Sequence, residues 1–436
     1  MLQRKITQKL QEWKREENKP CLLIKGARQV GKTFIIDHFA KENYKNYIYI
    51  NFELESNYKR IFDGNLDFKT LRMQLEVAFP DIKIEKGKTL LFLDEIQSCP
   101  NARVALKTFA LDGTIDVIAS GSLLGLYHNE VSSYPVGYER AYELLPLDFE
   151  EFLWALSVSN DIISTLRASY ENKSPLPPLI SQKMQEYFQD FMLVGGMPNV
   201  VNEFLKEKSP QKVRIVQKEI LESYKNDVIK YAPGATKPKI LKTYESIPAQ
   251  LAKKNKKFMF SDIGSETDAG ERKYGSALLW LKDAGIINFC YNLQEPALPL
   301  ASNRLLNSYK IYMRDTGLLV ASLDKDIQKA ILTNNYEVNQ GGIIENLFAE
   351  EIYSRYEDVT FFERRGKLEI DFVVNKDGLS TAIEVKSGND KRSKSLQSLI
   401  DNYKTVKRYQ KYELRDNPGI DENGIEHYPL FMVMFI

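Results

Sequence analysis

The fold of the first part of this chain is decided by eight residues, Gly26-Ala27-Arg28-Gln29-Val30-Gly31-Lys32-Thr33. They fit the spacing G-x-x-x-x-G-K-T, and they lie between an apolar run, 21–25, and an amphipathic stretch, 33–43. Glycines at the first and sixth positions let the backbone turn its amides onto a phosphate, and the following helix adds its positive end. The sequence therefore predicts a strand, a phosphate-binding loop and a helix. Lys32 is expected to contact the β and γ phosphates of a nucleotide, and Thr33 to ligate magnesium.

A second element, about sixty residues further on, supports this interpretation. Residues 89–93 are an apolar strand pattern that runs directly into Asp94 and Glu95. The carboxyl end of a buried parallel strand lies at the sheet edge where nucleotides bind. Two adjacent acids alone are more often a solvated strand end, but beside a phosphate loop they predict a magnesium ligand, Asp94, and a general base, Glu95.

Two further kinds of side chain could complete a site at this edge. The strand pattern 115–119 is followed by Ser120 and Ser122, whose short hydroxyls could contact the γ-phosphate and act as sensors; a plain turn is the alternative. An arginine that stabilises the transferring phosphoryl group is expected as well. Arg140 is the candidate, with Arg28 inside the loop, although arginines are more often surface or salt-bridged residues.

Composition limits the class of protein. The chain has 436 residues, which predicts about three domains. Its 60 Lys and Arg balance 59 Asp and Glu, so contact with nucleic acid must come from local patches. No apolar run is long enough for a membrane helix, and the charged N-terminus holds no signal-peptide core, so we expect a cytoplasmic protein with no membrane contact. The few cysteines and histidines are scattered, which disfavours a disulfide framework or a zinc site.

The pattern along the chain predicts an α/β protein of four segments. Residues 1–155 alternate buried strands and helices, as a parallel sheet with crossover helices does, after an amphipathic helix at 3–17. Residues 156–220 form a helical connector with a turn at Gly195 and Gly196. Residues 221–325 follow the order helix, turn, helix and two strands, which is compatible with a winged helix. Residues 326–436 form a second α/β domain, with a helix at 343–356, strands at 359–365, 368–374 and 381–388, and a helix at 395–409.

These motifs together resemble a family of bacterial and archaeal AAA-type ATPases that carry a C-terminal domain of unassigned function. The resemblance covers nearly the whole chain and is carried by 25–33, 50–53, 91–97, 120–125, 146–153, 194–201, 309–319 and 383–388. It implies binding and hydrolysis of ATP with Mg²⁺, with Lys32, Thr33, Asp94 and Glu95 in the Walker positions. AAA-type domains commonly work as rings, so it also implies a homo-oligomer. Family members often have Gly-Arg where this chain has Gly137-Tyr138, and Arg140 is the neighbouring substitute.

The C-terminal segment contains a second group of candidate residues. Asp371 is followed thirteen residues later by Glu384-Val385-Lys386, and this pattern resembles the PD-(D/E)xK nuclease-like fold, a restriction-endonuclease-like domain. On adjacent strands Glu384 and Lys386 project from one face, where Asp371, and Glu345 from the preceding helix, could complete an oxygen-rich magnesium site. The alternative is a degenerate relative that keeps these residues for hydrogen bonding or DNA positioning, because a short D…ExK pattern also occurs by chance.

Two basic segments, 237–257 and 391–411, each carry seven basic residues against one acid. Such patches could follow DNA phosphates, and a solvated helix face is about as common an explanation.

Three hypotheses follow. The first is an Mg-dependent ATPase that couples hydrolysis to rearrangement of DNA- or protein-binding C-terminal domains. The second is an ATP-regulated DNA nuclease that uses Asp371, Glu384 and Lys386. The third is a nucleotide-switched module that binds DNA or protein with little turnover.

Overall fold

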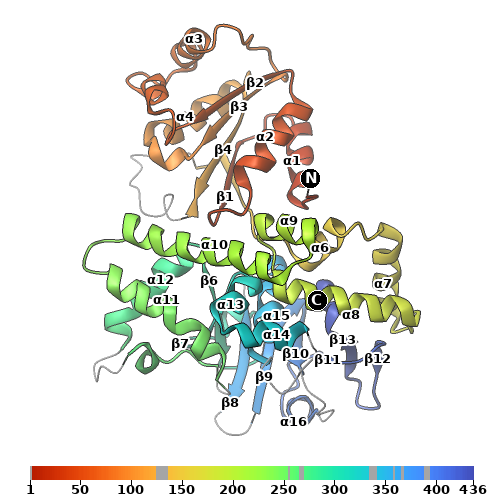
Figure 1. The fold of residues 1–436 in the computed structure, drawn as a ribbon. Coiled ribbons are helices and arrows are strands. Elements are labelled where there is room, and N and C mark those ends of the chain that lie inside the picture. Colours follow the sequence, from red (N-terminus) through yellow and green to blue (C-terminus); the bar gives the residue numbers. More distant parts are fainter. Residues whose placement is uncertain are drawn as a thin grey trace. The chain divides into compact units, whose positions relative to one another are not determined.

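The computed structural model describes residues 2–123, 136–253, 256–264, 270–332, 341–356, 359–364, 368–386 and 393–436. These residues divide into two compact units. The first is made up chiefly of Gln3–Leu145, and the second of Pro146–Lys282 and Ile286–Ile436. Figure 1 shows the elements of both units as a ribbon.

The first unit is built on a sheet of five parallel strands in the order β2-β3-β4-β1-β5. The strands are β1 (Cys21–Gly26), β2 (Asn46–Asn51), β3 (Thr89–Asp94), β4 (Asp116–Ser122) and β5 (Glu139–Glu143). Every residue of β3 and β4 is buried, as expected for central strands covered on both faces. The prediction of a parallel α/β sheet in the first segment is confirmed.

Helices of the first unit follow the apolar periodicity of the sequence. They are α1 (Ile6–Arg15), α2 (Lys32–Asn43), α3 (Phe68–Ala78) and α4 (Pro100–Asp112), with short 3₁₀ turns η1 (Ser56–Phe62) and η2 (Ile96–Ser98). Helix α1 buries Ile6, Leu10 and Trp13, which are the residues whose spacing predicts it. Asp67 caps α3 through a hydrogen bond from the Thr70 amide.

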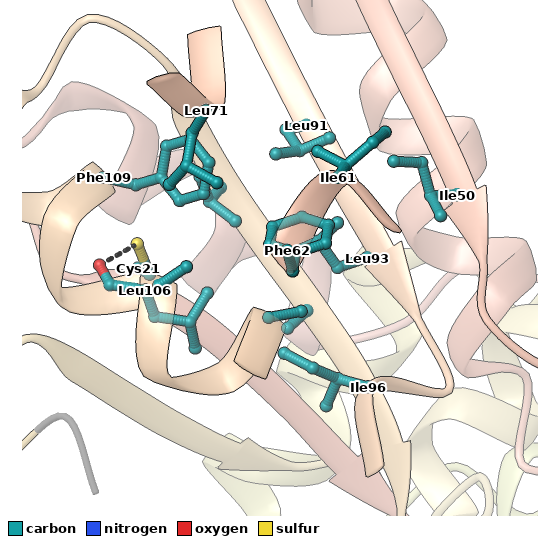
Figure 2. Close-up of a cluster of buried hydrophobic side chains, with 14 of the residues drawn as sticks. Cys21, Ile50, Ile61, Phe62, Leu71, Leu91, Leu93, Ile96, Leu106 and Phe109 are labelled. Carbon is teal, nitrogen blue, oxygen red and sulfur yellow. Dashed lines mark hydrogen bonds between the residues drawn. The ribbon is translucent and has the colours of Figure 1, made fainter. Parts of the chain in front are cut away.

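One face of this sheet forms an apolar core with η1, α3 and α4. Alternate strand residues such as Leu91 and Leu93 point into it, and Phe62 and Phe109 fill the space between the sheet and the helices (Figure 2). The Cys21 thiol also lies in this core, where it donates a 3.3 Å hydrogen bond to the Leu106 carbonyl. Burial raises the pKa of this thiol, so Cys21 is an apolar packing residue here.

The second unit is built on a mixed sheet of eight strands in the order β12-β13-β11-β10-β9-β8-β6-β7. Its strands, given in chain order, are β6 (Ile287–Leu293), β7 (Arg304–Met313), β8 (Thr360–Arg364), β9 (Leu368–Lys376), β10 (Leu379–Val385), β11 (Arg408–Glu413), β12 (Gly419–Ile420) and β13 (Glu426–Pro429). Strand β8 joins the two halves of the sheet, because it pairs antiparallel with β9 and parallel with β6.

Most of the helices of the chain belong to this unit. They are α6 (Phe149–Ala155), α7 (Asn160–Asn172), α8 (Pro178–Val194), α9 (Pro198–Glu207), α10 (Pro210–Tyr231), α11 (Lys237–Leu251), α12 (Glu271–Asp283), α13 (Thr316–Ser322), α14 (Lys325–Leu332), α15 (Gly341–Arg355) and α16 (Lys394–Asn402). Three 3₁₀ turns complete it, η3 (Phe260–Ile263), η4 (Leu300–Asn303) and η5 (Leu430–Phe435). Helix α15 is buried almost all round, which places it in the interior of the unit.

The second unit differs from the predicted division into three segments. Strands β6 and β7, expected as the wing of a separate module within 221–325, belong to the same sheet as β8–β13. The order helix, helix, strand, strand can be recognised within a short stretch of sequence. The strands with which β6 and β7 share a sheet are far away in sequence, so that order does not identify them. The helix expected at 395–409 also ends early, because α16 stops at Asn402 and Arg408 begins β11.

Three glycines permit a close backbone approach inside the second unit. A Cβ on Gly196 would lie 2.0 Å from the Leu147 carbonyl oxygen, and one on Gly317 would lie 2.2 Å from that of Val194. Gly195 has φ +72° and lies against the Asp315 carboxylate. Asp315 accepts hydrogen bonds from the amides of Gly196 and Leu318, at 2.8 and 2.7 Å. The segments 194–201 and 309–319, singled out in the sequence, therefore meet at this point.

Among the described residues, no helix combines the length and the apolar character needed to cross a membrane.

We expect Gly196→Ala to lower the free energy of unfolding by roughly 2–3 kcal/mol, because the new methyl group would collide with backbone atoms of Leu147 that cannot rotate away. Urea denaturation followed by circular dichroism measures this. Gly234→Ala is the matched control, since a Cβ there meets nothing within 4 Å. Equal stability of the two variants would contradict the steric explanation.

Candidate nucleotide site

The loop from Gly26 to Lys32 joins β1 to α2 as the sequence predicts. Gln29 and Gly31 have positive φ angles of 65° and 93°, which turn successive backbone amides toward one side. Gly26 has no room for a side chain, because a Cβ would lie 2.4 Å from the Leu144 carbonyl oxygen. Conformation and packing together explain why glycine stands at both motif positions.

Lys32 lies under this loop rather than in solvent. Its Nζ atom donates hydrogen bonds to the carbonyl oxygens of Gly26 and Ala27, at 3.0 and 2.9 Å. Burial lowers the pKa of Lys32 to about 8, and the nearby carboxylates of Glu95 and Asp94 oppose that shift. The ammonium group is therefore held at the loop by two weak acceptors that phosphate oxygens can replace.

Asp94 is the most densely hydrogen-bonded side chain of the site. Its Oδ2 atom accepts from Thr33 Oγ1 at 3.0 Å, Tyr49 OH at 3.1 Å and Asn51 Nδ2 at 3.2 Å. Its Oδ1 atom accepts from the Ser120 hydroxyl and, at 3.1 Å, from the Glu95 amide. The side chain is 1% exposed, so these donors fix one orientation of a buried carboxylate.

Glu95 follows in a left-handed conformation, with φ 54° and ψ 47°. Such a backbone is unfavourable for a residue with a side chain, and here it turns the chain sharply away from β3 directly after Asp94. Burial raises the pKa of the Glu95 carboxyl, the Gln97 side-chain amide lowers it by donating to Oε2, and Asp94 raises it further. A raised pKa suits a group that must accept a proton near neutral pH.

The two predicted sensor residues lie at the end of β4. Ser120 is fully buried and donates to Asp94, so here it orients the acid. Ser122 lies opposite Gly26 in the β1–β4 ladder, directly beside the phosphate loop. Of the two, Ser122 has the better position to contact a phosphate.

The structure does not bring Arg140 to the loop. Arg140 pairs with Leu22 in the β1–β5 ladder, four residues before Gly26, or about 13 Å along a strand. Its guanidinium forms a bidentate ion pair with Glu16, at 2.6 and 2.9 Å. Arg28 lies in the loop itself, where its charge helps to lower the pKa of Lys32.

Sequence reasoning missed three residues of this site. Tyr49 and Asn51 occupy alternate positions of β2, so both point to the face that carries Asp94. Arg4 is 7% exposed and donates to the carbonyls of Val30, at 3.3 Å, and Leu145, at 2.6 Å. The polar residues within the strand run 46–51 were a usable signal, whereas nothing in the sequence connects Arg4 with the loop.

The residues present fit a magnesium ion. Thr33 Oγ1 and Asp94 Oδ2 lie 3.0 Å apart at the start of α2, and both are the oxygen ligands that Mg²⁺ prefers. Mg²⁺ usually takes one or two such protein ligands and completes its coordination with water and substrate phosphates.

The C-terminal candidates meet only in part. The β9–β10 ladder ends at the pair Phe372 and Ile383, so Asp371 and Glu384 are the next residues of the two strands. Asp371 Oδ2 accepts from the Val385 amide at 2.8 Å, and Glu384 Oε1 lies 2.8 Å from Lys386 Nζ. Burial and then Glu345 raise the pKa of Asp371 to about 7, against the opposing charge of Lys310.

Glu345 contacts two lysines rather than the other acids. Its Oε1 and Oε2 atoms lie 2.9 Å from Lys310 Nζ and 2.6 Å from Lys256 Nζ. In the part of the chain that the structure describes, no group of three or more His, Cys, Asp or Glu side chains could hold a metal ion. Glu345, Asp371 and Glu384 therefore do not gather into one such group.

Much of the charge of the two basic segments is paired. In 237–257, Lys253, Lys256 and Lys257 pair with Asp262, Glu345 and Glu363. In 391–411, Lys411 is fully buried and pairs with Glu413. Lys254, Lys391 and Arg392 lie outside the described residues. As DNA-binding surfaces, both segments carry less free positive charge than their sequences suggest.

Comparison with known families supports an AAA-type domain in the first unit. Residues 18–153 match the family described as an AAA domain. Residues 185–329 and 340–430 match two domains of unknown function. The first unit therefore has both the family pattern and the loop geometry of an AAA-type P-loop domain, whereas a PD-(D/E)xK domain is not confirmed.

Several known proteins are similar to this chain at low sequence identity. An uncharacterized protein of Methanocaldococcus jannaschii is 25% identical over 85% of this chain and 76% of its own length. An uncharacterized protein of Haemophilus influenzae is 24% identical over 41% of this chain and 44% of its own length. A Walker-type ATPase of Pyrococcus abyssi has a TM-score of 0.45 and 15% identity, over 74% of this chain and 96% of that one. The Orc1 protein of Aeropyrum pernix, solved in complex with DNA, has a TM-score of 0.29 and 12% identity, over 76% of this chain and 91% of that one.

We expect Arg4→Met to lower the free energy of unfolding by about 1.5–3 kcal/mol, because it removes a charged donor from two carbonyls, one of them in the phosphate loop. Thermal and urea denaturation measure the loss. Arg140→Met is the control from the same unit: its ion pair with Glu16 is more than a third exposed and should contribute less than about 1 kcal/mol. A larger loss for Arg140→Met would reverse our ranking of the two arginines.

Proposed function

We propose that the chain is an Mg-dependent ATPase. The observation that carries this proposal is the convergence of Lys32, Thr33, Asp94 and Glu95 at the carboxyl ends of β1 and β3. The match of residues 18–153 to an AAA domain supports it. Binding uses the loop amides and Lys32, which exchanges the carbonyls of Gly26 and Ala27 for β- and γ-phosphate oxygens.

Thr33 and Asp94 would hold the magnesium ion, which supplies positive charge at the β and γ phosphates when bound. Tyr49, Asn51 and Ser120 keep the Asp94 carboxylate in one orientation. Glu95 accepts a proton from the attacking water, and its raised pKa makes it a stronger base than an exposed glutamate. Gln97 fixes the position of this carboxylate through Oε2.

Hydrolysis would drive rearrangement of the second unit, which we propose as the part that binds DNA or protein. A nucleotide-switched module with little turnover is the alternative, and the assay below separates the two. DNA stimulation of turnover would support a DNA partner.

We expect purified protein to hydrolyse ATP with Mg²⁺ at a rate that Glu95→Gln lowers about 10²- to 10⁴-fold, because the general base is lost. Lys32→Ala should abolish ATP binding. Phosphate release, measured with and without duplex DNA, and ATP titration calorimetry provide the readouts. Glu76→Gln, on the exposed surface of α3, is the control and should retain activity.

A Glu95→Gln variant with unchanged turnover would eliminate the base assignment. Tight ATP binding without hydrolysis in the unmodified chain would instead favour the switch.

The pH dependence of ATP binding tests the buried lysine. The amine of Lys32 loses its proton above about pH 8 in the free protein, and phosphate oxygens favour the protonated form. We therefore expect ATP affinity to be constant between pH 6.5 and 7.5 and to fall by up to roughly tenfold per pH unit above 8. Calorimetry across this range measures it. Lys32→Arg, which keeps its charge, should give a flat profile, and a flat profile for Lys32 itself would contradict the lowered pKa.

A further inference from the structure

The acids of the C-terminal segment are neutralised by lysines that come from outside that segment. Glu345 lies on α15, and its two nearest cations are Lys310, on β7, and Lys256, which follows α11. Both lysines belong to the region that precedes α14. The set of Glu345, Asp371, Lys310 and Lys256 is here called the lysine-acid cluster.

The carboxylate of Glu345 is engaged by an ammonium group on each of its two oxygens. Its Oε1 atom accepts from Lys310 Nζ at 2.9 Å and from the Tyr312 hydroxyl, and its Oε2 atom contacts Lys256 Nζ at 2.6 Å. The lysines hold the pKa of Glu345 down at about 2 against the opposing effect of burial. The charge of the acid is therefore balanced by two ammonium groups.

Lys310 is fixed in this position. Its side chain has no solvent exposure, its Nζ atom also lies 3.1 Å from Glu369 Oε1, and it stands 4.9 Å from the centre of the Phe361 ring. Its backbone bridges to Lys257, so the strand cannot swing the ammonium group away on its own. A divalent cation beside Asp371 and Glu345 would meet this buried positive charge.

Glu384 does not compensate for the loss of Glu345. One of its oxygens, Oε1, is paired with Lys386, and the other, Oε2, is buried and accepts no hydrogen bond from the described residues. Glu384 therefore offers one oxygen without a hydrogen-bond donor, on a carboxylate whose other oxygen is already paired with an ammonium group.

We propose that the C-terminal acidic residues form no divalent-metal site, and that the ammonium group of Lys310, with Lys256, takes the place that a metal would fill. The cluster then joins β7 and the segment after α11 to α15, so residues 340–436 do not form a self-sufficient nuclease domain. This inference is independent of the proposed ATPase activity.

Binding of Mn²⁺ to the full-length, nucleotide-free protein, followed by the electron paramagnetic resonance signal of free Mn²⁺, tests the proposal. We expect the unmodified chain and Asp371→Asn to take up the same amount of Mn²⁺, so that any weak uptake at Thr33 and Asp94 cancels. Lys310→Met keeps the length of the side chain and removes its charge, and it should raise Mn²⁺ affinity at least tenfold. Lys404→Met, at an exposed lysine beyond α16, is the matched control and should change nothing.

Uptake by the unmodified chain that Asp371→Asn or Glu384→Gln removes would overturn the proposal. So would a folded Lys310→Met protein, as judged by circular dichroism and gel filtration, that gains no Mn²⁺ affinity. If Lys310→Met does not fold, the Mn²⁺ uptake of the unmodified chain and of Asp371→Asn can still be compared, and this comparison tests the proposal. Lys256→Met, at the more exposed lysine, then provides a second variant that lacks one of the two charges.

Discussion

The buried carboxylate of Asp94 organises the nucleotide site. Donors from the start of α2, from β2, from β4 and from the adjacent backbone all end on its two oxygens. A buried carboxyl group is tolerated only when it is hydrogen-bonded in this way, so Asp94 also fixes how these elements meet. The phosphate loop and Glu95 adjoin it: Thr33 donates to Asp94 from the first turn of α2, and Glu95 leaves β3 in a left-handed conformation.

Most of the first unit could be predicted from sequence because its signals are local. The strands that carry the loop and the acids are continuous apolar runs, and the glycine and lysine positions follow from the chemistry of phosphate binding. Tyr49 and Asn51 were missed because their alternation along β2 shows that they share a face of the sheet but does not show that Asp94 lies on that face. Arg140 was misplaced with respect to the loop because its partner, Glu16, lies more than a hundred residues away in the chain.

The second unit shows the limit of the same reasoning. Its helices and strands were largely recognisable as elements, but the membership of β6 and β7 in one eight-stranded sheet depends on pairing with β8. The acids of the D…ExK pattern were found by spacing, whereas the lysines that neutralise Glu345 carry no motif. A sequence motif shows which acids are present, but the tertiary structure determines whether a metal ion or a lysine lies beside them.

The long separation of contacts in the second unit has a consequence for biosynthesis. All five strands of the first sheet lie within residues 21–143, so this sheet can pair as soon as that segment has left the ribosome. The second unit begins with α6, whose Phe149 amide is bound by Glu351, and its sheet is complete only with β13. Helices made early must wait for partners made some two hundred residues later. Newly made chains therefore pass through a stage in which the strands of the first sheet are all present while the early helices of the second unit still lack their partners.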